Sequence, residues 1–382
     1  MSGARWLRRH LLLAAGALPW AAGAAPVLRV GPTRPIKSLA AAARQARDGD
    51  VIEVDAGDYT ADVAAWPQHD LTLRAVGGRV RVIGAGAHVQ GKGLFVTSGR
   101  RQRIEGFDFS GATVPERNGA GIRLEAGSLT LVDCTFKDNQ NGLLSANEGS
   151  IELDIIDCDF GPILPGEGRT HNLYVGAIKR LAVSGSWFHH GFKGHLLKSR
   201  AALNHILYNR LTDEIGGRAS YELEFANGGV AVVMGNLIAQ SSTTENPHVI
   251  SFGAEGATWE KQALYLVNNT LVDQRPSGGI WLRVSPPQAE VVLANNLLVG
   301  GPKLAADGHW VRRANLEADW DEFVLAARDD FRLKPGSSLR GKAQPAGEGG
   351  GLKLTPTREY RHPRGTLPWD GSAPLSPGAF QR

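Results

Sequence analysis

A column of chemically active side chains recurs at regular spacing through the middle of the chain. Five apolar segments each place a polar residue directly after a large apolar one, and these polar residues are Tyr174, Lys198, Glu224, Ser251 and Arg283. Successive members lie 24, 26, 27 and 32 residues apart. Because side chains alternate between the two faces of a strand, this spacing predicts one outward column. Its phenol, amine, carboxylate and guanidinium groups are suited to proton transfer and to binding a negatively charged substrate.

The same segments carry polar groups at their ends. Three of them begin with His171, His195 and His248, and three are followed by Arg200, Asn227 and Glu255. Strand alternation predicts a second outward column one pleat earlier, made of Asn172, Leu196, Glu222, Val249 and Trp281. Longer loops at 161–170, 240–247 and 274–279 precede three of the segments. Long loops on one side of a repeat protein are expected to form the walls of a binding groove.

These residue types suit β-elimination from a uronic-acid polysaccharide. That reaction needs a group that neutralises the substrate carboxylate, a base that removes the neighbouring proton, and an acid for the leaving oxygen. We expect Lys198 to be the base, with its pKa lowered by Arg200 or by burial. The expected catalytic residues are Lys198, His195, Tyr174 and Arg283. The expected substrate-binding residues are His171, Arg200, Trp281 and His248, with Trp281 stacking on a sugar ring.

Other chemistry on the same face stays open. Glu222, Glu224 and Asn227 offer oxygen ligands for a Ca²⁺ ion that would bridge to the substrate carboxylate. Glu222 and Glu224 are also expected about 7 Å apart on one strand, a separation compatible with an inverting glycoside hydrolase. Protonation from the opposite ring face would instead give C5 epimerisation. A non-catalytic polysaccharide-binding or surface protein is the alternative from another class.

The element that must position these residues is a coil that repeats along the chain. Short strands recur at intervals of 23 to 33 residues, beginning at Phe107, Cys134, Cys158, Ser186, Asn209, Asn236, Asn269 and Asn296. Such a period indicates stacked supersecondary units, and no helix-length apolar pattern separates the strands. The sequence therefore predicts an all-β chain that forms a right-handed parallel β-helix over residues 26–302. A capping helix is expected at about 36–47, and an irregular strap at 303–382 that packs on the solenoid.

The residues that start these strands have a structural interpretation. Stacked Asn209, Asn236, Asn269 and Asn296 are expected to hydrogen-bond along the solenoid and to its corners. Cys134 and Cys158 occupy equivalent positions on adjacent coils, and we expect two buried thiols that fill space. Side-by-side residues of parallel strands suit disulfide geometry poorly.

Residues 1–25 have the pattern of an export signal. Three arginines precede a short apolar stretch, and small residues follow before Pro26. Loss of those arginines changes the net charge from +4 to +1, which removes the electrostatic case for nucleic-acid binding. The remainder contains no apolar run long enough for a membrane span. We expect an exported protein, periplasmic or extracellular, whose partner is an acidic polysaccharide; its oligomeric state stays open.

Several motifs resemble those of the pectin-lyase-like superfamily of right-handed parallel β-helix proteins. They are Ser38-Leu39-Ala40, the stretch Asp48 to Val54, Gly57-Asp58-Tyr59, the Asn-x-apolar repeat, Asp330 to Ser337, and Gly378-Ala379-Phe380. The resemblance covers nearly the whole mature chain and implies the fold. It leaves the activity among polysaccharide lyases, glycoside hydrolases, uronate epimerases, phage tailspikes and binding proteins. The Lys–Arg pair resembles that of Ca²⁺-dependent alginate and dermatan lyases and implies Ca²⁺, although their Asn-Gly-x-Glu motif is absent here.

Overall fold

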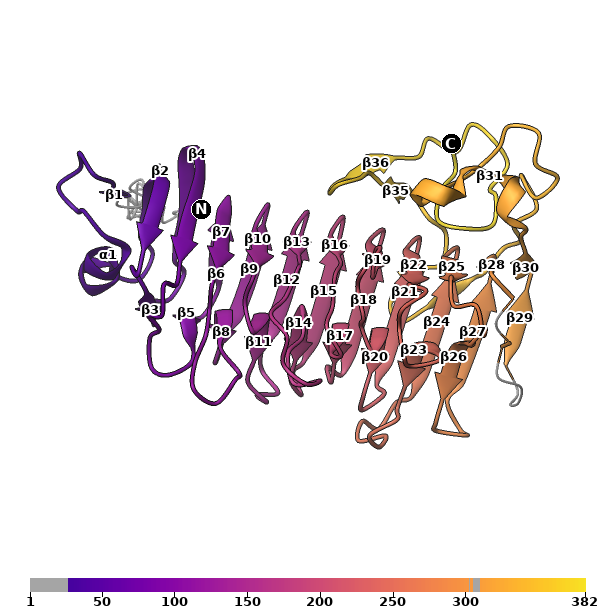
Figure 1. Cartoon of the computed structure of the whole chain (residues 1–382), viewed down its shortest axis with the longest axis horizontal. Coiled ribbons are helices and arrows are strands. Elements are labelled where there is room, and N and C mark those ends of the chain that lie inside the picture. The colour runs from indigo at the N-terminus through magenta and orange to yellow at the C-terminus, as the bar shows by residue number, and fades with distance from the viewer. Residues whose placement is uncertain (1–26, 302, 305–309) are drawn as a thin grey trace, which may run out of the picture.

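The structure is a computed structural model that describes residues 27–301, 303–304 and 310–382. The segment predicted to be an export signal lies outside these residues. Within them, no helix is long and apolar enough to cross a membrane. Parallel strands stack along one axis into a parallel β-helix, as the period predicted (Figure 1).

One face of the solenoid is a sheet of nine parallel strands that will carry the candidate site. In chain order its strands are β3 (Ala64–Trp66), β5 (Gly93–Thr97), β8 (Ala120–Leu124), β11 (Asn141–Ser145), β14 (Leu173–Val175), β17 (His195–Ser199), β20 (Tyr221–Phe225), β23 (His248–Phe252) and β26 (Ile280–Val284). Each strand pairs in parallel with the strand one coil away. Equivalent positions of successive coils are therefore direct neighbours.

The remaining solenoid strands form one larger sheet of two columns. The first column contains β1 (Val27–Val30), β2 (Val51–Thr60), β4 (Thr72–Ile83), β6 (Gln102–Glu105), β9 (Ser128–Val132), β12 (Glu152–Ile156), β15 (Arg180–Ser184), β18 (Leu203–Leu207), β21 (Val230–Met234), β24 (Ala263–Val267), β27 (Glu290–Ala294) and β29 (Val311–Arg313). The second contains β7 (Phe107–Ser110), β10 (Thr135–Lys137), β13 (Asp159–Phe160), β16 (Trp187–Phe188), β19 (Arg210–Thr212), β22 (Leu237–Gln240), β25 (Thr270–Asp273), β28 (Leu297–Val299) and β30 (Leu316–Glu317). The long strands β2 and β4 join the two columns, and the last rung continues past residue 302 to Glu317.

A helix lies at the N-terminal end of the solenoid. Helix α1 (Leu39–Gln45) is shorter than the expected 36–47, and it begins where the Ser38 hydroxyl accepts a hydrogen bond from the Ala41 backbone N–H at 3.1 Å. Leu39 and Ala42 are the buried residues of this helix. Figure 1 shows α1 beside the first coils, where a cover protects otherwise unpaired strand edges.

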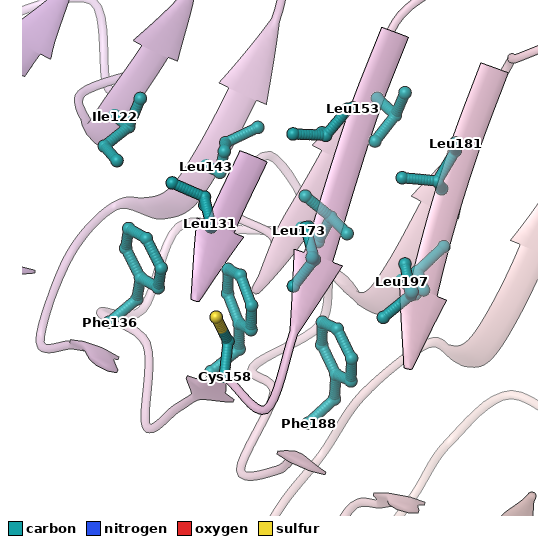
Figure 2. Close-up of a cluster of buried hydrophobic side chains, with 14 of the residues drawn as sticks. Ile122, Leu131, Phe136, Leu143, Leu153, Cys158, Leu173, Leu181, Phe188 and Leu197 are labelled. Carbon is teal, nitrogen blue, oxygen red and sulfur yellow. The ribbon is translucent and has the colours of Figure 1, made fainter. Parts of the chain in front are cut away.

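The interior is a stack of like side chains. The rings of Phe109, Phe136, Phe160 and Phe188 lie nearly parallel, with successive centroids 5.2, 4.5 and 4.8 Å apart. Figure 2 shows Phe136, Phe188 and Cys158 among the leucines of the surrounding coils. Because every coil adds the same apolar layer, coil-to-coil register is fixed by burial. The outward residues of each strand are thereby held in vertical columns.

The residues at the strand starts form one continuous hydrogen-bonded ladder. The backbone N–H of Asn209 donates to Asn236 Oδ1 at 2.8 Å, and the N–H of Asn236 donates to Asn269 Oδ1 at 3.0 Å. The same contact joins Cys134 N to Cys158 Sγ at 3.4 Å. Both cysteines are buried and free, as expected from their register. Sulfur and amide side chains thus occupy equivalent scaffold positions.

After β30 the chain forms a strap against the larger sheet, at the top of Figure 1. Its short elements are η1 (Trp320–Glu322), β31 (Phe323–Leu325), η2 (Ala326–Arg328), β32 (Asp330–Leu333), β33 (Glu348–Gly349), β34 (Leu352–Lys353), β35 (Arg358–Tyr360) and β36 (Thr366–Pro368). Phe323 and Phe331 of the strap pack with Leu237 and Leu297 of the solenoid. The nine-stranded sheet lies on the other side of Figure 1, away from the strap.

Candidate active site

The outward column has the register that the spacing predicted. Tyr174 pairs with Lys198, Lys198 with Glu224, Glu224 with Ser251, and Ser251 with Arg283. The apolar residue before each of them points into the coil. Strands β14, β17 and β20 therefore place Tyr174, Lys198 and Glu224 on three successive rungs, about 4.8 Å apart.

The predicted second outward column is wrong, because its residues face the interior. The ladder pairs His195 with Tyr221 and Leu197 with Leu223 but skips the position between them. Leu196 and Leu197 both belong to the buried core, as do Val249 and Ile250, so strict alternation does not hold at the strand starts. Trp281 is 2% exposed and belongs to the core. It is not a platform for sugar stacking.

The side chain of Glu222 also points into the coil, so Glu222 cannot take part in catalysis together with Glu224. Its side chain is fully buried, and neither carboxyl oxygen has a hydrogen-bond partner among the described residues. Burial raises the pKa of Glu222 well above its ordinary value, and the charge of Asp213 raises it further. Two predictions are therefore wrong: Glu222 and Glu224 do not form the carboxylate pair of a hydrolase, and Glu222 is not a Ca²⁺ ligand.

An ionic network connects the outward column to the strand ends. Lys198 Nζ lies 3.0 Å from Glu224 Oε2, and the same oxygen is 2.8 Å from His195 Nε2. Lys198 also contacts Glu255 Oε1, and Glu255 Oε2 contacts the Arg200 guanidinium. Glu255 thus holds two cations from a position on the loop that follows β23.

Arg200 extends the network to two further polar groups. Its Nε donates to the Tyr174 hydroxyl oxygen at 2.9 Å, and its Nη1 donates to Asn227 Oδ1 at 2.6 Å. Its backbone carbonyl accepts a hydrogen bond from Trp259 Nε1 at 3.0 Å. These contacts fix the guanidinium plane beside the Tyr174 hydroxyl.

The pKa of Lys198 is shifted in the opposite direction to the one that the sequence predicted. Burial alone would lower the pKa of Lys198, but hydrogen bonds and charges from Glu255 and Glu224 outweigh it and raise the pKa. Lys198 is therefore a protonated cation and not the poised base that the sequence predicted. Burial would likewise raise the pKa values of Glu224 and Glu255. Hydrogen bonds with His195 and Lys198 instead lower the pKa of Glu224 below its ordinary value, and Lys198 and Arg200 lower that of Glu255. Both carboxylates are ionised at neutral pH.

The predicted histidines form a column with one tyrosine. Ring centroids are 4.9 Å apart for His171 and His195, 5.1 Å for His195 and Tyr221, and 6.2 Å for Tyr221 and His248. His171 Nδ1 accepts a hydrogen bond from the His195 backbone N–H at 2.9 Å. Burial lowers the pKa values of all three histidines, so their rings are neutral at pH 7. The column lies beside the ionic network through the shared His195.

Comparison with solved structures bears on the fold alone. The crystal structure of pectate lyase Pel9A matches with a TM-score of 0.60 and 12% identity, covering 94% of this chain and 98% of that one. The molecule therefore has a parallel β-helix fold similar to that of this pectate lyase. The crystal structure of Escherichia coli ybhc matches with a TM-score of 0.30 and 10% identity, covering 83% of this chain and 89% of that one, too weakly to carry an argument. No protein-family model and no curated protein sequence matches the chain.

The Ca²⁺ ligands expected from the sequence do not fit an ion. Glu222 points into the coil, and Asn227 Oδ1 already accepts from Arg200. Glu224 Oε2 is shared by Lys198 and His195. A cation placed among these groups would meet the positive charges of Lys198 and Arg200. We derive no catalytic step through a metal ion.

Of the eight predicted catalytic and substrate-binding residues, the structure brings five together and leaves three outside; Glu224 and Asn227, predicted as metal ligands, also lie in the network. Tyr174, His195, Lys198, Arg200 and His171 form one cluster through direct contacts and ring packing. Arg283 is exposed two rungs beyond Glu224, and no hydrogen bond joins it to the network within the described residues. His248 bonds instead to Asn246 at 3.0 Å, and Trp281 is in the core.

Sequence reasoning assigned no role to Glu255 or Tyr221. Glu255 closely follows its strand, as Arg200 and Asn227 follow theirs, which was a usable signal. Tyr221 lies in register with His195, and the ladder of strand starts indicated that position. What the sequence lacked was the path of the 253–262 loop, which carries Glu255 back across two coils.

The loops before the strands line a cavity, as their length suggested. It has a volume of about 480 Å³ and is lined by Glu167, Lys193, Arg218, Ser220, Glu245 and Asn246, among others. Two of the three long loops, at 161–170 and 240–247, contribute to its wall. The cavity adjoins the start of β20, next to the His171–His248 column. This face therefore has an ionic network at its centre and a cavity beside it.

Proposed function

We propose that the protein is a lyase that cleaves a uronic-acid polysaccharide by β-elimination at the face formed by β14, β17 and β20. One observation carries the proposal: a carboxylate, that of Glu255, is held between Lys198 and Arg200. The Glu255 side chain is 42% exposed and lies on a loop. A uronate carboxylate has the same charge and the same bidentate geometry, so it would replace Glu255 in this cradle.

The two cations would supply the first requirement of the reaction. A carboxylate that is paired with Lys198 and Arg200 withdraws electron density from C5 of the sugar and makes its proton more acidic. Lys198 keeps its proton in this arrangement because Glu224 remains beside it. Its role is charge neutralisation. His195 holds Glu224 at 2.8 Å and is a positioning residue for this pair.

Tyr174 is the proton-transfer residue of the proposal. Its hydroxyl oxygen accepts a hydrogen bond from Arg200 and therefore lies next to the expected carboxylate site. A phenolate at this position takes the C5 proton, the C5–H electron pair forms the C4=C5 double bond, and the C4–O bond breaks. The resulting phenol then gives its proton to the leaving oxygen, and the phenolate regains from water the proton that it lost before the reaction, which restores the neutral starting state.

Elimination is favoured over hydrolysis by the charges on the carboxylates. A glycoside hydrolase needs one protonated carboxylic acid near the scissile bond. Glu224 and Glu255 have lowered pKa values, and Glu222 is sealed inside the coil. We further propose that the protein is exported, on the basis of the pattern in residues 1–25.

A binding experiment tests the carboxylate cradle directly. Titration calorimetry with polygalacturonate and with its carboxyl-reduced counterpart compares substrates that differ only in charge. We expect binding of the acidic polymer alone, and weaker binding when Arg200 is replaced by glutamine. Equal affinity for both polymers would overturn the proposed substrate class.

A further inference from the structure

A second cavity lies between the strap and the solenoid, away from the nine-stranded sheet. Its volume is about 450 Å³, and it contains five arginines: Arg210, Arg328, Arg332, Arg361 and Arg382. Three acids share the lining, Asp329, Asp330 and Glu359. Arg210 comes from strand β19, and the other lining residues come from the strap. We refer to this space as the strap cavity.

Three of the arginines are neutralised inside the cavity wall. Arg332 Nη2 lies 2.5 Å from Asp330 Oδ2, and Arg382 Nε lies 3.0 Å from Glu359 Oε1. Arg210 is almost fully buried. Its Nη2 lies 2.8 Å from Glu214 Oε1 and 3.3 Å from Asp329 Oδ2. The Arg210–Asp329 pair joins the strap to the solenoid, and the three pairs account for every acid in the lining.

Arg328 and Arg361 are the remaining two cations. Both are exposed, and neither makes a side-chain hydrogen bond or an ion pair with any residue that the structure describes. The charge of Arg361 acts on the pKa of Asp157, but the two side chains are too far apart for an ion pair. Together with Glu214, which pairs with Arg210, four acids face the five arginines, so the cavity has one excess positive charge and two guanidinium groups with free donors. Guanidinium groups bind planar and tetrahedral oxyanions with paired hydrogen bonds.

The rest of the wall is firmly held and partly apolar. Tyr360 is buried, and its hydroxyl donates to the Pro363 carbonyl oxygen. Glu359 accepts a hydrogen bond from the Gln381 backbone N–H at 2.8 Å, which fixes the C-terminal residues. Leu367 and Phe380 add apolar surface. A cavity of this size with an apolar wall and a few converging polar groups has the make-up of a small-ligand site.

We propose that the strap cavity binds a small ligand that carries an oxyanion group, which Arg328 and Arg361 contact. The group is a carboxylate, sulfate or phosphate, and its source is either an inorganic anion or an acidic sugar that rests on Leu367 and Phe380. This site goes beyond the proposed lyase function. It uses neither Lys198 nor Arg200, and it lies on a different face of the solenoid.

Calorimetry on the full chain at constant ionic strength tests the site and its ligand. The probes are sodium sulfate, galacturonate and neutral galactose. We expect sulfate or galacturonate to bind and galactose not to bind; tighter binding of galacturonate identifies a sugar site, and tighter binding of sulfate identifies an inorganic one. The double variant Arg328→Gln/Arg361→Gln should weaken this binding at least about tenfold, since two charge-assisted contacts are lost.

Two controls keep this result separate from the lyase proposal. Arg44→Gln/Arg47→Gln removes two exposed arginines in and just after α1 with the same charge change and should leave binding unchanged. Galacturonate that binds at the Lys198–Arg200 cradle would be lost in Lys198→Ala and kept in the double variant. Unchanged affinity for both anions in the double variant would overturn the strap-cavity site, and so would failure of both anions to bind wild-type protein.

Discussion

Lys198 and Glu224 face each other on adjacent rungs, with Lys198 Nζ 3.0 Å from Glu224 Oε2. Both side chains are at least nine-tenths covered, so the pair is held in a region of reduced dielectric constant. Lys198 and Arg200 carry two positive charges, and Glu224 and Glu255 carry two negative charges, so the network is neutral. Displacement of Glu255 would leave one net positive charge, which matches the single negative charge of one uronate unit. This balance is the electrostatic basis of the proposed substrate preference.

Removal of Glu255 should strengthen substrate binding. The Glu255 carboxylate competes for the cradle, and a competing group reduces apparent affinity by the fraction of molecules in which it is bound. We expect Glu255→Ala to lower the Kd for polygalacturonate, or for the best acidic polymer, by about threefold or more. Glu260→Ala, an exposed acid nearby in the sequence, is the matched control. Weaker binding of Glu255→Ala would show that Glu255 itself contacts the substrate.

Substitution of Lys198 separates charge neutralisation from proton abstraction. Lys198→Ala should lower kcat/KM by about 10²-fold, the scale observed when one electrostatic stabiliser is removed. Lys198→Arg keeps the positive charge and should retain clearly more activity than Lys198→Ala. Steady-state kinetics on folded protein, verified by thermal unfolding, measure both, with Lys179→Ala on another face as the control. If Lys198→Arg were as inactive as Lys198→Ala, the charge-neutralising role would be wrong.

Asp213 should make stability fall as the pH rises. Burial raises its pKa from 3.8 to about 7, despite hydrogen bonds from the Ala219 and Gly191 backbone N–H groups. The folded state therefore holds this proton more tightly than the unfolded state. The resulting stabilisation is complete below about pH 4 and is lost as the pH rises through 7, a change of up to about 4 kcal/mol.

Denaturant unfolding at several pH values measures the Asp213 effect. The free energy of unfolding of wild-type protein should decline between pH 4 and 7 relative to that of Asp213→Asn, which cannot ionise. The comparison uses the slope, because the substitution also alters hydrogen bonds and shifts stability at every pH. Glu260→Gln provides the same change of charge on the surface. Parallel pH profiles for wild type and Asp213→Asn would contradict the raised pKa.

The amide ladder should contribute to stability without contributing to turnover. Asn236 Oδ1 accepts from Asn209 N at 2.8 Å, and Asn236 Nδ2 donates to the Ile206 carbonyl oxygen at 2.8 Å. Asn236→Ala leaves these buried groups unpaired and should lower the free energy of unfolding by about 1–3 kcal/mol. The exposed Asn118→Ala should change it by no more than about 0.5 kcal/mol. Loss of activity in folded Asn236→Ala would contradict a purely structural role.

The fold and the outward column could be predicted from the sequence because both depend on periodicity. Apolar residues in phase from coil to coil determine the register, and Tyr174, Lys198 and Glu224 follow from it by strand alternation. Glu222 and Trp281 were misplaced because alternation fails at the strand start, where the ladder skips one residue. No residue type in the sequence marks this departure from alternation.

The state of Lys198 could not be derived from its own strand. Its pKa is set by Glu224 one rung away and by Glu255 from a loop two coils later in the chain. The spacing indicated the first of these contacts. The second depends on the path of the 253–262 loop, which no periodic pattern specifies. Sequence reasoning therefore placed Tyr174, Lys198 and Glu224 in one column but predicted the wrong direction for the pKa shift of Lys198.

The most direct test of the central claim is the ultraviolet absorbance of reaction mixtures with a panel of uronic-acid polysaccharides. β-Elimination creates a C4=C5 double bond conjugated with the carboxylate, which absorbs in the ultraviolet, whereas hydrolysis, epimerisation and simple binding do not. We predict a steady increase in absorbance with at least one of polygalacturonate, alginate, hyaluronan and dermatan sulfate, and its loss in Tyr174→Phe. New reducing ends without any increase in absorbance, or no change with any of these polymers, would contradict the lyase assignment.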